Sequence, residues 1–436
     1  MSFFYITTLG CKVNQYESDG IATVLSKHGW TRVEAVEQAS VCIVNTCAVT
    51  SRAAVQSRQA VRSIIRTNPR ARVIVTGCHA QTEPDLVGKI ENVDHVVGHG
   101  DKFKIAEAVI ASAQGNPFLP SPDRPFCSLT DFQGFEPAVT GNMTRAYLKI
   151  QDGCNAFCSY CIVPYARGRS RSMPMEDVLA HLNHLHEQGY KEVIVTGIHT
   201  GAWGADLPEP SSFFNLVKTI VETSPIHRIR ISSIEPMELS DEILGLAAAH
   251  PMICDHLHIP LQSGDDGILK RMGRPYDTGY FRELVLKAHE AMPRAALGVD
   301  LLQGFPGEST RAFERTHELI SGLPISYLHV FPFSPRKGTP AFDFPDRVEP
   351  GVLKQRCAAM RALGREKRRV FELANVGNRL SAVIQERRDD PTGMLKAVTS
   401  NYLTLLVNGG DDLKRCVVDL IVDGVDADGQ ILGHII

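Results

Sequence analysis

The sequence predicts an α/β protein built from three consecutive domains, and three observations support this prediction. Short apolar strands alternate with helical stretches over residues 1–114 and again over residues 145–372, as in parallel sheets covered by helices. After residue 375, short strands follow one another without helices between them. At roughly 100–200 residues per domain, a chain of this length has room for several domains.

The first domain, residues 1–114, is predicted to contain a doubly wound parallel sheet. Its candidate strands are residues 3–8, 41–45 and 72–76, each followed by a helix-like segment. Residues 115–144 then contain five prolines and three glycines, which exclude a helix or a central strand. We therefore expect residues 115–144 to be a linker between domains.

The second domain, residues 145–372, resumes the alternation of strands and helices, with helical stretches such as residues 175–188 and 280–290. Six such units fall short of the eight that a complete barrel requires, so we expect a partial (β/α)6 barrel. The candidate strands are residues 146–151, 192–196, 229–233, 257–261, 297–302 and 327–331.

The third domain, residues 375–436, is predicted to be a small β-barrel. Gly and Asp are frequent between its strands, as tight turns require. Its candidate strands are residues 380–385, 395–398, 402–407, 415–422 and 430–435.

Composition and charge exclude several classes of protein. Apolar residues make up 43% of the 436-residue chain and charged residues 22%, which is too apolar for a disordered chain. No apolar run approaches the ~20 residues that span a bilayer, so we expect no membrane association. The start of the chain lacks a signal peptide pattern, which favours a cytoplasmic location. A net charge of −3 excludes a globally basic nucleic-acid binder and leaves local basic patches open.

Three of the eleven cysteines form a motif with the spacing Cys-x3-Cys-x2-Cys. Cys154, Cys158 and Cys161 follow the first strand of the predicted partial barrel, at the end where such folds place their chemistry. Zinc is one alternative, but structural zinc sites use four ligands and paired short spacings. Three thiolates can instead hold a cubane iron–sulfur cluster and leave one iron open to another ligand.

A second set of three cysteines follows the strands of the first domain. Cys11, Cys47 and Cys78 each lie two or three residues beyond the end of one of its three candidate strands. Because the carboxyl ends of parallel strands meet at one edge of a sheet, we expect these thiols to share a cluster there. The remaining cysteines stand alone in the sequence and are expected to be structural or incidental: Cys42, Cys127, Cys254, Cys357 and Cys416.

Residues 148–168, LKIQDGCNAFCSYCIVPYARG, resemble the cluster loop of radical S-adenosylmethionine enzymes, and more narrowly that of the methylthiotransferases. The resemblance implies that S-adenosylmethionine chelates the open iron and is cleaved reductively to a 5′-deoxyadenosyl radical. It also implies a second [4Fe–4S] cluster on Cys11, Cys47 and Cys78, which carries or delivers sulfur. The third domain resembles the TRAM domain of RNA-modifying enzymes.

The same resemblance assigns candidate cofactor-binding residues to the ends of the barrel strands, where polar or Gly-rich turns recur. Gly197 is expected to meet the amino group of S-adenosylmethionine, and Tyr160 is expected at the same site. Ser233, Glu235 and Gln262 are candidates for the ribose and carboxylate. No residue is assigned a catalytic role, and the role of His199 stays open.

Local basic runs favour an RNA partner, although such runs are also common on solvated surfaces. One run recurs along a predicted helix, one follows the cluster loop, and one leads into the third domain. They comprise Arg58, Arg62 and Arg66; Arg167, Arg169 and Arg171; and Lys354, Arg356, Arg361, Arg365, Lys367, Arg368 and Arg369.

Three short stretches favour one branch of the family: GCKVNQYES at residues 10–18, CAVT at 47–50 and GCHAQ at 77–81. They look most like the branch that converts N6-threonylcarbamoyladenosine at position 37 of tRNA to its 2-methylthio derivative. The isopentenyl branch usually has Gln-Met-Asn after the first cysteine. This resemblance implies the tRNA anticodon stem-loop as a partner, together with an electron donor and a sulfur donor of unknown identity.

Two alternatives stay open. Within the family, the substrate could be N6-isopentenyladenosine in tRNA or an aspartate of a ribosomal protein. In a different class, the chain could be a non-catalytic RNA-binding protein with a structural metal ion.

Overall fold

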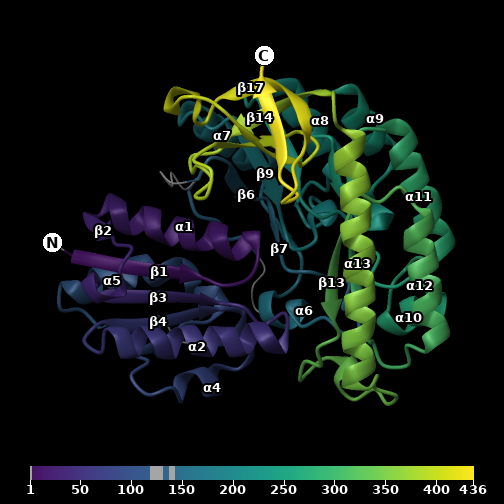
Figure 1. Cartoon of the computed structure of the whole chain (residues 1–436). Coiled ribbons are helices and arrows are strands. Elements are labelled where there is room, and N and C mark those ends of the chain that lie inside the picture. Colours follow the sequence, from purple (N-terminus) through teal and green to yellow (C-terminus); the bar gives the residue numbers. More distant parts are fainter. Residues whose placement is uncertain (1, 118–130, 137–142) are drawn as a thin grey trace.

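The computed structural model describes residues 2–117, 131–136 and 143–436, and Figure 1 shows three groups of elements that follow one another along the chain. Residues 2–114 form a layered α/β unit, a curved set of strands and outer helices follows, and the C-terminal strands close into a barrel. The predicted fold class is confirmed. No helix in the described part of the chain combines the length and apolarity needed to cross a membrane.

The N-terminal sheet is parallel throughout, with the strand order β2-β1-β3-β4-β5. Helices cover both faces: residues of α1 and α5 pack on one side and residues of α2 on the other. Strands β2 and β5 escape sequence reasoning because they are only three and two residues long. The strands are β1 (Ser2–Thr8), β2 (Trp30–Arg32), β3 (Val41–Thr46), β4 (Arg72–Gly77) and β5 (His95–Val96). The helices are α1 (Lys12–Lys27), α2 (Ser51–Thr67), α3 (Cys78–Thr82), α4 (Pro84–Gly88) and α5 (Ile105–Ala113).

The central domain contains six principal parallel strands in two groups of three, ordered β10-β9-β6 and β11-β12-β13. Isolated parallel bridges, Ile229 to Ile253 and Ser233 to His258, link the two groups into one curved wall. The strands are β6 (Ala146–Lys149), β9 (Glu192–Thr196), β10 (Arg228–Ile231), β11 (His256–His258), β12 (Ala296–Gln303) and β13 (Tyr327–Pro332). Two further short strands, β7 (Gln151–Asp152) and β8 (Arg171–Ser172), pair with each other beside the cluster loop.

The helices of the central domain surround this wall and bury its apolar side chains in the largest core of the molecule. Several begin with a Ser or Asp whose side chain accepts a hydrogen bond from a backbone N–H of the first turn, which stabilises the helix start. The helices are α6 (Val163–Arg167), α7 (Met175–Glu187), α8 (Phe213–Thr223), α9 (Asp241–Ala249), α10 (Asp266–Met272), α11 (Thr278–Ala291), α12 (Thr310–Gly322) and α13 (Pro350–Ala374).

The C-terminal strands form a closed barrel with the order β14-β15-β16-β18-β17. The long helix α13 runs along the central domain and leads into this barrel (Figure 1). Inward-facing side chains such as Ala382, Leu405 and Leu420 fill the barrel core. The strands are β14 (Arg379–Ile384), β15 (Leu395–Thr399), β16 (Thr404–Val407), β17 (Val417–Val425) and β18 (Ile431–Ile435).

Part of the segment that the sequence predicts as a linker packs on the N-terminal domain. Phe135 is buried there, and its backbone exchanges two hydrogen bonds with the Tyr16 hydroxyl, at 2.9 and 3.2 Å. A Cβ atom on Gly20 would collide with the Phe135 ring, so this helix position requires glycine. The rest of the expected linker lies largely outside the described residues.

Candidate functional site

The first cysteine set lies in the loop between β7 and α6. Cys158 is buried, while Cys154 and Cys161 are partly exposed. The loop closes through a 2.9 Å hydrogen bond from the Cys154 N–H to the Gly168 carbonyl. Gly153 has a φ of +73°, and a Cβ atom there would collide with the backbone of Arg169. This turn therefore depends on glycine.

His199 connects the cysteine loop to the end of β9. Its Nδ1 lies 3.4 Å from the Cys154 sulfur, and its Nε2 lies 2.7 Å from the Glu238 carboxylate. Burial alone would lower the pKa of His199, but the contacts with Cys154 and Glu238 raise it to about 10. The sequence leaves the role of His199 open. The signal that could have pointed to a role is the position of His199 just after a strand.

Arg274 connects the same loop to Glu235. Its Nη1 donates to the Cys158 sulfur at 3.3 Å, and its Nη2 forms an ion pair with the Glu235 carboxylate. Burial raises the pKa of Glu235 and Arg274 opposes that rise. Tyr160 packs edge-on against Phe305, with ring centroids 6.5 Å apart. Sequence reasoning missed Arg274, which stands alone in a turn with no motif around it.

Gln151 holds the turn after β9 against the cysteine loop. Its side-chain oxygen accepts hydrogen bonds from the N–H groups of Ile198 and His199, at 3.0 and 2.8 Å. Its amide nitrogen donates to the Gly153 carbonyl at 2.8 Å. A Cβ atom on Gly197 would lie 3.0 Å from the Gln151 oxygen, a tight contact that glycine avoids.

Ser233 and Gln262 lie farther along the wall of strands. The Ser233 hydroxyl lies 3.1 Å from His258 Nδ1. Gln262 has a φ of +73° and its backbone is bridged to β12. Among the described residues, no hydrogen bond joins either side chain to the cysteine loop, whereas Glu235 is connected to that loop through Arg274. The structure thus brings Glu235 and Tyr160 near the cysteines and leaves Ser233 and Gln262 on the adjoining strand ends.

The second cysteine set occupies one edge of the N-terminal sheet. Cys11 follows β1 and is exposed, Cys47 follows β3 and is buried, and Cys78 begins α3 directly after β4 and is buried. These three strands are adjacent in the sheet, which explains why residues far apart in sequence meet. Gly10 has a φ of +103°, and a Cβ atom there would lie 2.9 Å from the Cys47 sulfur. Only glycine lets these two loops approach so closely.

Three of these thiols, those of Cys47, Cys78 and Cys161, have raised pKa values and are poor acids without a bound cation. Burial raises the pKa of Cys47 to about 12 and also raises that of Cys78. Burial and the neighbouring Cys158 raise the pKa of Cys161 to about 12. Thiolates are the metal-binding form of cysteine, so occupation of either set must release protons.

The donor sets fit polynuclear clusters better than a single metal ion. Among the described residues, the groups of three or more ligand atoms within 4.8 Å of one another are His258–Asp300–His329 and Glu17–His99–Asp152, and neither includes a cysteine. Three thiolates on one zinc ion would lie about 3.8 Å apart, given Zn–S bonds of about 2.3 Å. In a [4Fe–4S] cluster each thiolate binds its own iron, which suits the wider spacing.

A buried network of charges joins the two cysteine-bearing domains. Arg167, at the end of α6, contacts Glu17 at 3.0 Å and Asp152 at 2.9 Å, and its Nη2 donates to Asn14 at 2.6 Å. Glu17 is also bound by Lys102 at 2.5 Å. Burial alone would raise the pKa of Glu17, but the surrounding cations, Arg167 foremost, hold it well below its usual range.

The two cysteine loops therefore face each other across the domain boundary. Cys78 packs with Ala48 and Ala166 in a small apolar cluster, and Ala166 belongs to the helix that follows Cys161. This arrangement corrects one expectation from the sequence. Arg167 and Arg171 are 1% and 3% exposed, so they are not basic surface for RNA, and only Arg169 of that run is exposed.

The other basic runs are more accessible. Arg62 and Arg66 are exposed on α2, whereas Arg356 on α13 is buried in an ion pair with Glu308 at 2.7 Å. The exposed face of α13 borders an open groove of about 600 Å³. Its charged lining comprises Arg361, Arg365, Arg368, Arg369, Glu372 and Asp426.

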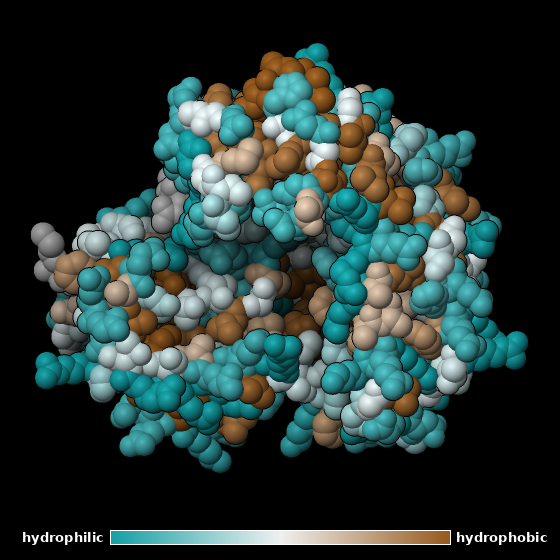
Figure 2. All heavy atoms as spheres, in the orientation of Figure 1, coloured by the Kyte–Doolittle hydropathy of each residue, from teal (hydrophilic) through white to brown (hydrophobic). Residues whose placement is uncertain are grey.

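A second cavity of about 300 Å³ lies at the junction of the central domain and the C-terminal barrel. Figure 2, in the orientation of Figure 1, shows the surface hollowed near its centre, between the N-terminal, central and C-terminal parts of the chain. The cavity lining is Arg145, Tyr327, His329, Arg368, Val398, Tyr402 and Thr404. Sequence reasoning named none of these except Arg368, because their convergence depends on the docking of the barrel.

The cysteines outside the two sets show no common pattern. Cys42 belongs to the apolar core beneath α2, Cys254 and Cys357 are buried, and Cys416 is partly exposed. Cys127 lies outside the described residues.

Comparison with known proteins assigns the chain to a family. Residues 148–320 match the radical SAM superfamily, and residues 3–98 match a family described as uncharacterized protein family UPF0004. The chain is 36% identical to threonylcarbamoyladenosine tRNA methylthiotransferase MtaB of Bacillus subtilis, over 93% of this chain and 90% of that protein. It is 33% identical to the protein of that name in Aquifex aeolicus, covering 95% and 98% of the two chains.

Among solved structures, the radical S-adenosylmethionine methyltransferase TsrM from Kitasatospora setae shares the fold, with a TM-score of 0.59 and 17% identity. The alignment covers 78% of this chain and 77% of that one. The superfamily match implies S-adenosylmethionine and a [4Fe–4S] cluster as cofactors. With near full-length relatives at this identity, the chain belongs to the radical S-adenosylmethionine methylthiotransferases.

Proposed function

We propose that this chain converts N6-threonylcarbamoyladenosine at position 37 of tRNA to its 2-methylthio derivative. The observation that carries this proposal is that the two cysteine sets lie on opposite sides of the Arg167 network. Cys78 packs against the helix that follows Cys161. Such an arrangement suits a reaction that activates a carbon atom at one centre and supplies sulfur at another. The names of the relatives support the choice of nucleoside.

In this proposal, Cys154, Cys158 and Cys161 hold a [4Fe–4S] cluster that binds S-adenosylmethionine. Cys11, Cys47 and Cys78 hold a second [4Fe–4S] cluster. When bound, the first cluster and its ligand supply a 5′-deoxyadenosyl radical, and the second supplies sulfur. Separate electron and sulfur donors of unknown identity complete the set of partners.

The protein's own residues then bind and orient the cofactor. Gln151 fixes the backbone at Gly197, where the amino group of S-adenosylmethionine would be received. Glu235 is held by Arg274 beside Cys158 and presents its carboxylate to the same region. Tyr160 lies close to both charged groups, while Ser233 and Gln262 extend the site along the strand ends.

The tRNA anticodon stem-loop is the proposed macromolecular substrate. The arginines of α13 border the groove of about 600 Å³ beneath the C-terminal barrel and supply positive charge for phosphates. The second cavity is lined by Tyr327 and Tyr402, aromatic rings on which an unstacked base can rest. A base must leave its stack to reach a buried radical centre, which this cavity would allow.

Nucleoside analysis tests the substrate. Total tRNA from a strain lacking this chain should lose 2-methylthio-N6-threonylcarbamoyladenosine and accumulate the unthiolated nucleoside, and expression of the wild-type chain should restore it. Cys154→Ala should fail to restore it, while Cys416→Ala, at a cysteine outside both sets, should restore it fully. Loss of 2-methylthio-isopentenyladenosine instead, or an unchanged nucleoside profile, would overturn the proposal.

Iron analysis tests the two clusters separately from the substrate. Anaerobic reconstitution should give about eight irons per chain, corresponding to two [4Fe–4S] clusters. Joint substitution of Cys11, Cys47 and Cys78 by Ala should leave about four irons and retain reductive cleavage of S-adenosylmethionine. Four irons in the wild-type chain, or zinc in place of iron, would contradict the assignment.

A further inference from the structure

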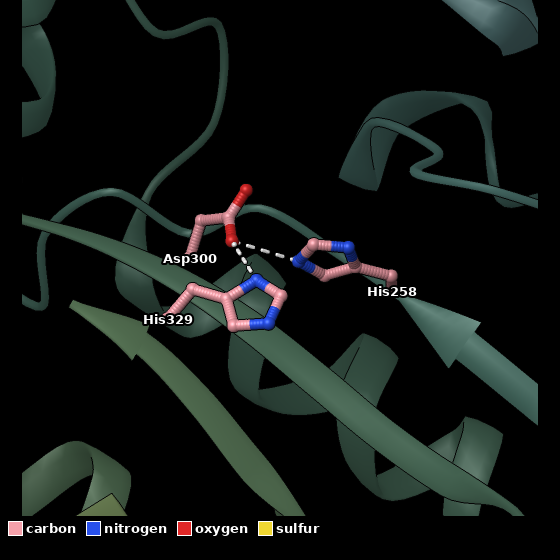
Figure 3. A group of neighbouring side chains, drawn as sticks. All are labelled: His258, Asp300 and His329. Carbon is pink, nitrogen blue, oxygen red and sulfur yellow. Dashed lines mark hydrogen bonds and ion pairs between the residues drawn. The ribbon is translucent and has the colours of Figure 1, made fainter. Parts of the chain in front are cut away.

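Two histidines and an aspartate converge on three neighbouring strands of the central domain, outside both cysteine sets. His258 ends β11, Asp300 lies in β12, and His329 lies in β13. Strand β12 pairs in parallel with both of its neighbours, and Asp300 is directly opposite His329. Figure 3 shows the three side chains pointing toward one another. Their ligand atoms, one from each residue, all lie within 4.8 Å of one another.

The spacing of these atoms fits a single divalent metal ion. Asp300 Oδ1 lies 2.8 Å from His258 Nε2 and 3.1 Å from His329 Nδ1. Two ligands bound at about 2.1 Å lie about 3.0 Å apart when the angle at the metal is about 90°, and about 3.4 Å apart when the angle is tetrahedral. An ion therefore fits among the three atoms with little movement of the strands.

His258 also has the supporting contact that is typical of metal-binding histidines. Its other ring nitrogen, Nδ1, lies 3.1 Å from the Ser233 hydroxyl. A hydrogen bond at the second ring nitrogen fixes the tautomer and the orientation of a ligand histidine. Burial alone would raise the pKa of Asp300, but hydrogen bonds with His258 and His329 lower it. The carboxylate is therefore in the ionised form that binds metal ions.

The second group of clustered ligand atoms, Glu17–His99–Asp152, does not suit a metal ion. Arg167 binds both of its carboxylates, at 3.0 and 2.9 Å, so protein cations already neutralise their charge. All three residues are buried, which closes the path for an ion from solvent. Asp300 differs, because no Lys or Arg among the described residues forms an ion pair with it.

The His258–Asp300–His329 group is accessible from the cavity of about 300 Å³ at the junction with the C-terminal barrel, because His329 lines that cavity. The His329 side chain is 49% exposed, which gives an ion a path of entry. The two arginines of the cavity, Arg145 and Arg368, are paired with Glu192 and Glu372, which limits their repulsion of a cation.

We propose that His258, Asp300 and His329 bind one divalent transition-metal ion such as Zn²⁺. Imidazole nitrogens together with a carboxylate are ligands typical of this class, whereas Mg²⁺ and Ca²⁺ prefer oxygen atoms alone. Zn²⁺ has no geometric preference from its d electrons and accepts such donor sets in sites that keep one position open. Water or an oxygen atom of a molecule in the cavity completes the coordination. The site is separate from both cysteine sets, and it does not depend on the proposed function.

Metal analysis of the reconstituted protein tests this site. The protein, with its iron–sulfur clusters in place, is dialysed against micromolar Zn²⁺, and iron and zinc are measured by mass spectrometry. The wild-type chain should hold about one zinc per chain in addition to its iron. X-ray absorption at the zinc edge should show only nitrogen and oxygen ligands at about 2.0–2.2 Å, whereas zinc bound to cysteine would show sulfur at about 2.3 Å.

Three variants locate the ion. Asp300→Asn keeps the size of the side chain and removes its charge, and His329→Ala removes a ligand that is half-exposed. Each should weaken zinc binding at least about 100-fold, because loss of a ligand costs more than loss of a supporting contact. Ser233→Ala removes only the contact with His258 and should weaken zinc binding about 10-fold.

His434→Ala is the matched control. His434 pairs with Asp423 at 2.7 Å on the barrel, and no third ligand atom joins this pair among the described residues, so its loss should leave zinc binding unchanged. Iron content should be the same in all variants. The inference is overturned if the wild-type chain binds no zinc, if the zinc has sulfur ligands, or if Asp300→Asn binds zinc as tightly as the wild type. None of these results alters the nucleoside test of the proposed function.

Discussion

Arg167 and Asn14 are joined by a 2.6 Å hydrogen bond that connects the two cysteine-bearing domains. The Asn14 amide donates in turn to the carbonyls of Leu9 and Thr46, at 2.8 and 3.1 Å, close to Cys11 and Cys47. The end of one cysteine loop is thus connected through a single side chain to two loops of the other set. The distance between the proposed clusters depends on this connection.

Replacement of Arg167 should disturb both stability and coupling. Arg167→Met would leave Glu17 and Asp152 buried without their principal counter-ion, which costs about 3–5 kcal/mol in the free energy of unfolding. Arg167→Lys should keep more stability but lose the bond to Asn14, because one ammonium group cannot replace the planar guanidinium. We expect this variant to cleave S-adenosylmethionine while methylthiolation falls at least about 10-fold, corresponding to about 1.4 kcal/mol.

Chemical unfolding and parallel assays of cleavage and methylthiolation measure these effects. Arg169→Lys, at an exposed position two residues away, is the matched control and should change neither quantity. Equal losses of cleavage and methylthiolation in Arg167→Lys would argue against a coupling role.

Arg274→Gln should weaken the binding of S-adenosylmethionine. The substitution removes the partner of Glu235, whose pKa burial already raises, and it removes a donor to the Cys158 sulfur. A loss of about 10-fold in affinity is expected for one charge-assisted interaction. Equilibrium binding to the reconstituted enzyme measures the change, and Arg282→Gln on the exposed side of α11 serves as control. Wild-type affinity in Arg274→Gln would show that this link does not position the cofactor.

Acid should loosen the attachment of the C-terminal barrel. Burial alone would raise the pKa of Glu192, but Arg230, Arg228 and Arg145 lower it to about 2. A carboxyl group whose pKa is depressed on folding contributes its stability fully above the unfolded value of about 4.5 and loses it as the pH falls toward 2. The shift corresponds to roughly 3 kcal/mol at most.

The pH dependence of the unfolding free energy measures this contribution. Glu192→Gln should be less stable than the wild type at pH 7. Its unfolding free energy should also lack the part of the decline between pH 4.5 and 2 that protonation of Glu192 causes in the wild type. Glu366→Gln, at an exposed position on α13, should retain the wild-type profile. If the unfolding free energy depends on pH identically in the wild type and in Glu192→Gln, Glu192 is excluded as the source of the acid sensitivity.

Gly10→Ala should prevent assembly of the second cluster. The added methyl group would lie 2.8 Å from the Cys47 Cβ atom, and the backbone φ of +103° is unfavourable for alanine. Gly29→Ala is a matched control, because Gly29 also has a positive φ but no atom lies within 4 Å of the added methyl group. Iron analysis should give about four irons per chain for Gly10→Ala and about eight for Gly29→Ala. Eight irons in both would show that the loops can separate without losing the cluster.

Periodicity predicted the strands well wherever they are long and apolar. Residues 41–45, for example, appear as β3 (Val41–Thr46). The six strands predicted for the central domain are all present near their expected positions. Short strands such as β2 and β5 were missed because three or two residues give no detectable alternation. The closed C-terminal barrel was predictable from its turns.

The site was less predictable because it depends on contacts between distant segments. Arg167 looks like surface charge in the sequence, since its partner Glu17 lies 150 residues away. Arg145 belongs to no motif, and the cavity that it lines exists only after the barrel docks. The cluster cysteines can be recognised from their spacing in the sequence, whereas the residues that connect the two cysteine sets cannot.

Four of the hydrogen bonds that attach the barrel to the central domain use barrel backbone carbonyls as acceptors. Arg228 donates to Ser381 and Val398, and Arg230 donates to Thr399 and Ser400. Because no barrel side chain takes part in these bonds, mutations can alter the outer surface of the barrel without removing them. Substitutions on the outer surface of the barrel can therefore accumulate while these bonds keep the domain in its position beside the central domain.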